Sequence, residues 1–433
     1  MITFLKKLIF TSFFKQVFII FLINVIGRLF FLIDQHFSAQ LSQQHLVTVS
    51  MVANLFFIVQ IIIQLFTQPT LVLLSKETDF KRRATTITGS FLVAIVSGIL
   101  FLILSFAFAE KMLEFFSIPV ADDSIYYAKI CSFAATTWIL NGLFKWSLIG
   151  IGRTKFVLVS DVITTTSNFI LKVFIFSLPI SVSAKFLSLP VVMFCMFAIS
   201  AVVQFFILKP YLSFQFYSVV QYLRRARHLL LGEALAAILF HSRPILISLI
   251  LVKNAAPQLV AAFSVANSVF SLFFFSTLSI TAAGTIYLAS GWSSGQHPAQ
   301  IFEKIKTIRW VTLVLVGPPI LIALIFVPWW LPQFFNISGI ENEILVATIL
   351  LTIIPIAFSI ESICLIRISE KPLIFSISNF AVHYLIGLPL IYIGLTNWNS
   401  GYLWSIAGLL LPTAFRELLI ILYARKVGFK SWH

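Results

Sequence analysis

Long apolar runs separated by short polar segments extend over the whole chain. A helix that crosses the hydrocarbon core of a bilayer needs about 20 apolar residues, and about twelve runs reach that length. The runs are continuous rather than alternating, which favours helices over the strands of a membrane barrel. We therefore predict helices at residues 17–39, 46–75, 84–109, 125–151, 155–180, 186–212, 229–253, 258–290, 309–328, 344–367, 372–395 and 401–424.

The composition is typical of a membrane protein. Hydrophobic residues make up 60% of the 433 residues and charged residues only 10%, whereas a soluble domain carries about 25% charged residues. The expected fold class is an all-α polytopic membrane protein, with the lipid bilayer as a partner. The net charge of +15 is spread over many loops rather than gathered in one patch, which argues against a nucleic-acid partner.

No motif in the sequence points to an enzyme or to a bound cofactor. The sequence contains neither paired His or carboxylate residues at catalytic spacing nor a nucleotide-binding P-loop. The cysteines Cys131, Cys195 and Cys364 lie in apolar runs, without the spacing of metal ligands. We therefore expect no metal site, no cofactor, no enzymatic activity and no self-contained ATP-driven pump.

The charges of the loops alternate along the chain. Basic clusters precede every second predicted helix, as at 81–83 and 153–155, and the longest basic loop is 213–228. By the positive-inside rule these loops lie in the cytoplasm together with both termini. The lysines within residues 1–16 predict an amphipathic lead-in that lies on the membrane surface.

The chain also contains two similar halves. A Val-Ala-Asn triplet at 52–54 returns at 265–267, and segment 148–155 is echoed by 365–372, in both cases after close to half of the chain. Six helices per half give both halves the same orientation, so they are predicted to be parallel repeats. The expected domains are an N-terminal six-helix bundle with the lead-in (1–212), a basic cytoplasmic linker (213–228) and a C-terminal six-helix bundle (229–433).

Several segments resemble motifs of one transporter family. The loop at 150–155 (GIGRTK), followed by Asn168, resembles a Gly-x-Gly-x-Thr loop and the Asn after it. Asp34 is similar to the acidic residue of the family's first helix, and 258–262 (QLVAA) to an Ala-Ala pair. Residues 370–392 are similar to the last loop and an Ile-Pro-Leu-x-Tyr helix. In this order and spacing, the motifs resemble those of the multidrug and toxic compound extrusion (MATE) transporters.

The resemblance implies two six-helix bundles facing each other in a V around a central cavity. It also implies a bacterial inner membrane, a monomer, and export of small organic, cationic or amphipathic compounds in exchange for H⁺ or Na⁺. The family shares the multidrug/oligosaccharidyl-lipid/polysaccharide exporter superfamily with flippases for lipid-linked oligosaccharides. A flippase for a lipid-linked anionic oligosaccharide or polysaccharide precursor is the alternative, which the cations inside the predicted spans favour.

Ionisable residues inside a predicted span are candidates for function, because burying a charge in a membrane is costly. Asp34 is the first candidate for ion coupling, since a carboxylate in a cavity can exchange a proton for a cation. His241 titrates near physiological pH and can relay protons. Glu361 lies at a depth similar to that of a carboxylate in some family members. Lys145 and Asp161 lie closer to the cytoplasmic loop 150–155 and are expected at the membrane interface.

Lys172 departs from the pattern of the family. One branch carries an Asp four residues after the Asn of the fifth helix, whereas here Asn168 is followed by Lys172. A cation at this place cannot hold sodium and repels cationic compounds. It therefore favours an anionic substrate, serves as a built-in counter-ion for Asp34, or extends to the outer membrane interface, and the sequence leaves all three open.

Other polar residues are expected to line the substrate cavity. Asn24 lies one helical turn before Arg28 on the same face, and Gln60 and Gln64 share a face four residues apart. The two Val-Ala-Asn triplets contribute Asn54 and Asn267, and Arg243 follows His241 by two positions. The expected cavity set is Asn24, Arg28, Asn54, Gln60, Gln64, Asn168, Lys172, Arg243 and Asn267.

Overall fold

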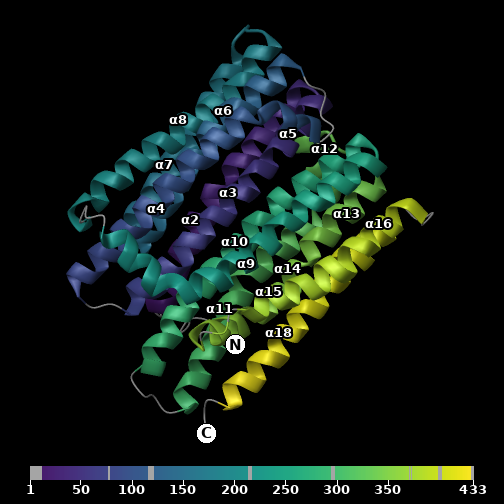
Figure 1. Ribbon diagram of the computed structural model, residues 1–433. Coiled ribbons are helices and arrows are strands. Elements are labelled where there is room, and N and C mark those ends of the chain that lie inside the picture. Colours follow the sequence, from purple (N-terminus) through teal and green to yellow (C-terminus); the bar gives the residue numbers. More distant parts are fainter. Residues whose placement is uncertain are drawn as a thin grey trace. The chain divides into compact units, whose positions relative to one another are not determined.

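The computed structural model describes residues 12–76, 79–115, 121–212, 217–293, 298–369, 371, 373–397 and 402–430. These residues form helices joined by short connections, without a strand among them (Figure 1). The predicted lead-in lies outside the described residues up to residue 11, as do residues 213–216 of the predicted linker. The first half contains α2 (Ser12–Leu41), α3 (Gln43–Lys76), α4 (Phe80–Ala107), α5 (Ala109–Phe115), α6 (Asp122–Gly150), α7 (Thr154–Ser177), α8 (Val182–Leu208) and η1 (Lys209–Tyr211).

The second half of the chain contains three helices interrupted by a change in helical geometry or by a single residue. The tenth predicted span is formed by α13 and α14, the eleventh by α15, η2 and α16, and the twelfth by α17, η3 and α18. The elements are α9 (Tyr217–Asn254), α10 (Pro257–Ser293), α11 (Pro298–Ile325), α12 (Val327–Phe335), α13 (Ile340–Leu351), α14 (Ile353–Ile368), α15 (Leu373–Asn379), η2 (Phe380–Gly387), α16 (Leu388–Asn397), α17 (Leu403–Ser405), η3 (Ile406–Leu410) and α18 (Leu411–Lys430).

The predicted helices are confirmed, and each of the twelve apolar runs falls on one helix or one continuous series of helices. In the described part of the chain, eleven of these are long and apolar enough to cross a membrane. The remaining one, α6, is 29 residues long but carries more polar residues. The chain is therefore an integral, all-α membrane protein. The V-shaped cavity stays a prediction.

Similar features recur at matching places in the two halves. A short helix follows the third span (α5) and the ninth (α12). The Val-Ala-Asn triplets lie near the beginning of α3 and α10, the second and eighth spans. Residues 148–150 end the fourth span, and residues 365–368 end the tenth. This placement is what a duplicated six-helix unit predicts.

The contacts between helices divide the chain into two compact units. Unit 1 comprises Met1–Arg28, Val265–Gln333 and Ile337–His433, and unit 2 comprises Leu29–Ser264 and Phe334–Asn336. Helix α9 belongs to unit 2, where it packs against α3 and α4, and it begins within the predicted linker. The expected boundaries of the two six-helix bundles, at 212 and 229, stay a prediction.

In unit 1, the π-helical segments η2 and η3 meet at two glycines. A β-carbon on Gly408 would lie 2.3 Å from Cγ1 of Ile391 and 3.0 Å from the carbonyl oxygen of Gly387. A β-carbon on Gly387 would lie 2.9 Å from the carbonyl oxygen of Gly408. Small residues let the backbones of membrane helices approach closely, so these glycines permit the contact.

In unit 2, α4 and the first turns of α9 are also in close contact through a glycine. A β-carbon on Gly89 would lie 2.4 Å from the carbonyl oxygen of Ser218 and 2.5 Å from the β-carbon of Tyr222. Tyr222 is fully buried, and its hydroxyl donates to the carbonyl oxygen of Phe66 at 3.2 Å. The same hydroxyl accepts from Thr70 Oγ1 at 3.2 Å. These contacts hold the beginning of α9 against α3 and α4.

Replacing Gly89 by alanine is expected to destabilise the protein by about 1–3 kcal/mol, because overpacking forces the backbone of α9 to move. Gly98 on the same helix is the matched control. A β-carbon there would meet only Thr136 Cγ2, at 3.5 Å, and alanine favours a helix over glycine by about 1 kcal/mol. Thermal unfolding in detergent should give a lower midpoint for Gly89→Ala, and an equal or higher one for Gly98→Ala. Equal midpoints for the two variants would contradict the close α4–α9 contact.

Candidate functional site

Asp34 and Lys172 form an ion pair inside unit 2. Asp34 lies on α2 and Lys172 on α7, both side chains are buried, and Lys172 Nζ contacts Asp34 Oδ1 directly. Taking one charge out of water costs several kcal/mol, and a directly bonded opposite charge offsets much of that cost. Of the three roles that the sequence leaves open for Lys172, the structure supports the built-in counter-ion for Asp34.

The pattern of α7 explains why Lys172 points into the bundle. Its neighbours Leu171 and Val173 and the two residues before them, Phe169 and Ile170, are exposed, as expected for side chains that face lipid. The helix packs against α6 and α8 with its polar residues turned inward. The long lysine side chain thereby reaches α2 across the interior of the bundle.

Several polar groups surround this pair. Tyr127 and Cys131 on α6 are buried and lie close enough to Asp34 to interact with its charge. Asn168, one turn before Lys172, is fully buried, and neither polar atom of its side chain has a hydrogen-bond partner within the described ranges. Since buried amides are nearly always hydrogen-bonded, the Asn168 side chain is able to take a partner that comes and goes.

Gln35, the residue after Asp34, joins three helices of unit 2. Its Nε2 lies 3.4 Å from Ser50 Oγ on α3 and 3.4 Å from Ser264 Oγ on α10. Ser264 Oγ also donates to the carbonyl oxygen of Ser50 at 3.3 Å. These hydrogen bonds join α2 to α3 and α10 at the residue next to Asp34. A change in the charge of Asp34 therefore acts on a helix that is hydrogen-bonded to two neighbours.

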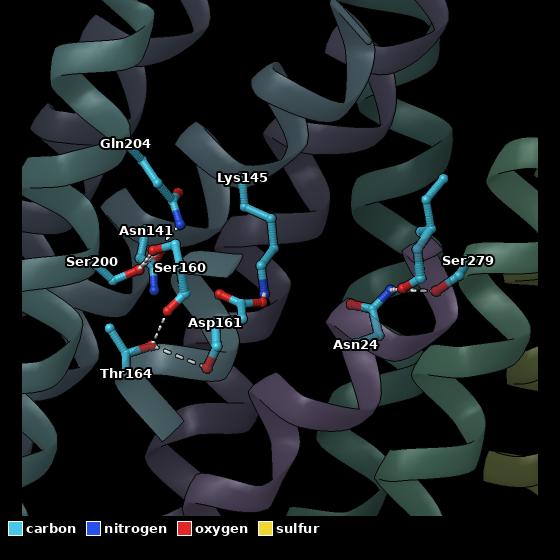
Figure 2. A network of polar contacts seen from close by, with 10 residues as sticks. Asn24, Asn141, Lys145, Ser160, Asp161, Thr164, Ser200, Gln204 and Ser279 are labelled. Carbon is cyan, nitrogen blue, oxygen red and sulfur yellow. Dashed lines mark hydrogen bonds and ion pairs between the residues drawn. The ribbon is translucent and has the colours of Figure 1, made fainter. Parts of the chain in front are cut away.

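A second ion pair of unit 2 lies nearer the start of α7. Lys145 Nζ on α6 is 2.5 Å from Asp161 Oδ2 on α7, and Figure 2 shows the two side chains pointing toward each other. The side chains are only 12% and 4% exposed. The sequence predicts an interfacial position for both residues. Both side chains are buried inside the bundle, where each neutralises the other, and their interfacial depth stays a prediction.

Beside this pair, hydroxyl and amide groups of α6, α7 and α8 form a connected network (Figure 2). Ser200 Oγ lies 3.1 Å from Ser160 Oγ, donates to Asn141 Oδ1 at 3.2 Å and accepts from Gln204 Nε2 at 3.1 Å. Thr164 Oγ1 donates to the carbonyl oxygen of Ser160 at 2.8 Å. The polar residues of three helices thus meet in the interior of unit 2.

Asn24 and Arg28 are brought together in unit 1, as their shared helix face predicts. Asn24 Nδ2 donates to Ser279 Oγ on α10 (Figure 2) and to the carbonyl oxygen of Ile20 at 3.3 Å. The guanidinium of Arg28 lies 3.4 Å from the ring centre of Phe275, one turn before Ser279 on α10. Such a cation–π contact stabilises a charge away from water. Arg28 and Asp34 therefore take partners in different units.

Unit 1 contains two further paired carboxylates. Glu361 on α14 accepts two hydrogen bonds from Arg309 on α11, one of them from Nε at 2.7 Å. Glu417 on α18 is buried, accepts from Ser359 Oγ at 2.5 Å and contacts Arg416. Glu361 is thus engaged by a basic partner that no sequence motif indicates, because the two residues belong to different predicted spans.

The other candidates are spread over α3, α9 and α10. His241 and Gln60 are buried, whereas Gln64, Arg243 and Asn267 are half-buried. Asn54 lies on α3, and its side chain is outside the described residues. The roles of all these residues stay predictions.

Known structures share this fold over almost the whole chain. A MOP superfamily transporter from Pyrococcus furiosus Vc1 (DSM3638), described with a binding pocket of reverse polarity that suggests a different function, matches with a TM-score of 0.76 at 14% identity, over 98% of this chain and 97% of that one. An outward-facing multidrug resistance MATE family transporter of the same superfamily matches with a TM-score of 0.76 at 13% identity, again over 98% and 97%. An inward-facing form matches with a TM-score of 0.71 at 15% identity, over 93% and 94%.

This chain has the fold of the MATE transporters of the MOP superfamily. No family model and no curated protein matches the sequence. At these identities the likeness establishes the fold alone, and with it the resemblance inferred from the motifs is confirmed at that level. Within this fold, the buried carboxylates Asp34 and Asp161 are each paired with a lysine.

The sequence contains a signal for the second ion pair. Asp161, Thr165, Asn168 and Lys172 follow one another at spacings of four, three and four residues, which places them on one face of a helix. A run of polar residues at this spacing inside a membrane span predicts an inward-facing polar stripe. The partner Lys145 cannot be found this way, because the rotation of α6 relative to α7 decides which of its residues reaches Asp161.

Replacing Lys172 by methionine is expected to destabilise the protein by about 3–5 kcal/mol, because Asp34 is then left as a buried, unpaired charge. The double variant Asp34→Asn with Lys172→Met removes both charges and should recover most of that loss. Thermal unfolding in detergent measures both effects, with Lys155→Met at the exposed start of α7 as the control. Losses that simply add in the double variant would show that the two side chains do not interact.

Proposed function

We propose that this protein is a secondary active transporter that exports small organic compounds by alternating access, coupled to a proton gradient through Asp34 and Lys172. The buried ion pair in unit 2 carries this proposal, because one proton that binds to Asp34 changes the net charge of the pair. The MATE fold supports it, since transporters with this fold are described in both outward-facing and inward-facing conformations. On this basis the protein is a transporter rather than an enzyme.

A proton suits this pair better than a sodium ion. Sodium has to displace the ammonium of Lys172 from the carboxylate, whereas a proton can bind the second oxygen of Asp34 and break the pair by removing its negative charge. Proton binding leaves Lys172 as an isolated buried cation. The resulting arrangement is unstable unless the helices move or a substrate offers a new partner.

The energy of this step is sufficient to drive a conformational change. Leaving one member of a buried pair uncompensated costs about 3–5 kcal/mol. Each 1.4 kcal/mol changes an equilibrium constant about tenfold, so protonation of Asp34 biases the two states by about a hundredfold to several thousandfold. A shift from 1:99 to 99:1 requires about ten-thousandfold, so this single pair accounts for most of a complete switch.

Cationic or amphipathic organic compounds remain the proposed substrates, with amphipathic compounds favoured by the many apolar and aromatic side chains. A flippase for a lipid-linked anionic precursor is the second candidate. It is favoured by two cations within the spans, Arg28 on α2 and Arg243 on α9, because arginine binds phosphate groups in a bidentate manner.

We further propose a bacterial inner membrane, cytoplasmic termini and a monomeric protein. Basic residues at the beginning of α4, Lys81 and Arg82, are exposed, as are Arg224 and Arg225 in α9. Since the beginnings of α4 and α9 are in contact through Gly89, both clusters lie at the same end of unit 2. Basic clusters at one end are typical of the cytoplasmic side.

Asp34→Asn is expected to reduce export at least tenfold, because an amide cannot gain and lose the coupling proton. Efflux of ethidium is measured in cells that lack their own exporters and produce this protein at equal levels. Asp122→Asn, an exposed change at the beginning of α6, should export at the wild-type rate. An uncoupler should abolish efflux by the wild-type protein and by Asp122→Asn. Gradient-dependent efflux by Asp34→Asn at the wild-type rate excludes Asp34 as the coupling residue.

The flippase alternative predicts a different response to the loss of cations. Arg28→Gln combined with Arg243→Gln should abolish assembly of the cell's lipid-linked glycan and leave ethidium resistance intact. For an exporter, Asp34→Asn should lose ethidium resistance and leave glycan assembly unchanged. Both readouts come from one strain, so the two functions are distinguished by which of them fails.

A further inference from the structure

The inward face of α7 is polar over most of the length of the helix. Its buried residues after Val157 are all polar or charged: Ser160, Asp161, Thr164, Thr165, Asn168 and Lys172. The outward face is apolar, with exposed residues such as Val162 and Ile163. Helices in a membrane associate largely through small and apolar residues with occasional hydrogen bonds. Packing alone therefore does not account for a stripe of six polar residues, two of them charged.

This stripe joins the two ion pairs of unit 2. Asp161 and Lys172 are eleven residues apart, which is about three turns and about 16 Å along a helix. At about 100° per residue their side chains point in nearly the same direction. Thr165 and Asn168 lie between them on the same face. Asp161 itself is seven residues, or about 10 Å, from the first residue of α7, Thr154.

Few charged groups face this path. Lys145 on α6 faces Asp161, and Lys172 faces Asp34, where Tyr127 and Cys131 of α6 also lie close. From α8, the network beside Asp161 contains only neutral side chains, those of Ser200 and Gln204. Among these groups, Asp161 and Asp34 each have one basic partner, Lys145 and Lys172.

We infer that the inner face of α7 conducts protons between the end of the helix at Thr154 and the carboxylate of Asp34, with Asp161 as an intermediate proton carrier. The inference rests on the proposed coupling role of Asp34. It adds Asp161, Lys145 and Thr165 to the residues that serve transport, and it gives Asn168 a role in proton transfer.

The transfer consists of proton exchanges between oxygen atoms. The carboxylate of Asp161 takes a proton from water at the Thr154 end, and Lys145 keeps its own proton. Asp161 then releases the proton to water that hydrogen-bonds to Thr165 and Asn168, and this water passes it to Asp34. Asp161 and the water return to their original protonation states, so one proton enters, one reaches Asp34, and no other reactant is needed.

Asn168 is the residue that distinguishes a proton path from a structural polar contact. Its amide is fully buried without a hydrogen-bond partner among the residues described, although leaving such a group unsatisfied is unfavourable. The amide stands between the two pairs, one turn before Lys172, where a water molecule in transit is able to hydrogen-bond to it. Gln204 Oε1 is a second such buried atom, on the side of Asp161.

Asn168→Leu tests this path without breaking an ion pair. The protein is placed in lipid nanodiscs and the buffer pH is changed rapidly. The carboxyl band of Asp34 is then followed by time-resolved infrared spectroscopy and assigned with Asp34→Asn. We expect Asn168→Leu to slow protonation of Asp34 at least tenfold while leaving its final extent and the unfolding midpoint unchanged. Thr165→Val should slow it as well, whereas Thr166→Val, on the exposed face next to it, should not.

Asp161→Asn combined with Lys145→Met removes the proton carrier and its counter-ion together, and it should slow protonation of Asp34 by a similar factor. Wild-type rates in this variant and in Asn168→Leu would overturn the path while leaving Asp34 as the coupling residue. The absence of any pH-dependent Asp34 band in the wild-type protein would overturn both the path and the proposed coupling. The two failures are therefore distinguishable in one set of spectra.

Discussion

The high free energy of a charge inside a membrane is the constraint on which this structure depends. Four carboxylates lie next to a basic side chain within the helix bundles: Asp34, Asp161, Glu361 and Glu417. Pairing makes these charges tolerable but contributes little net stability compared with apolar residues of the same shape. A proposed role in which the charge changes, as for Asp34, gives a reason for a buried carboxylate in a chain that is otherwise so apolar. The pair of Asp34 and Lys172 passes such a change to other helices most directly, because Gln35 beside Asp34 is hydrogen-bonded to α3 and α10.

The helices themselves could be predicted from the sequence, because length and hydropathy determine a membrane span almost independently of its neighbours. The repeat could also be predicted, and it explains why short helices follow both the third and the ninth spans. The partners of the charged residues were less accessible. Asp34 and Lys172 lie on the first and fifth spans, and only the family resemblance suggested that they lie close to each other. Arg309 was missed as the partner of Glu361, because spacing along a chain does not determine how two distant helices are rotated.

The close glycine contacts complement the ion pairs. At Gly89 and at Gly408, backbone or β-carbon atoms of a second helix occupy the space that a side chain would need. Such contacts fix helices at a short distance through dispersion forces and do not depend on pH. Each unit thus combines permanent contacts with pairs whose strength depends on protonation. A protein with both kinds of contact can respond to a proton without losing its helical packing.

The polarity of α7 also has a consequence for how the protein is made. Of the eleven apolar spans, α7 is the least hydrophobic, and each charge at the centre of an isolated helix opposes insertion by about 2.5–3.5 kcal/mol. Its neighbour α6 is more polar still, and only residues 151–153 separate the two helices. Neither helix is suited to stay alone in lipid while the ribosome completes the chain. Biogenesis therefore favours α6 and α7 entering the bilayer as a hairpin, with Lys145 and Asp161 already joined when they leave the translocon.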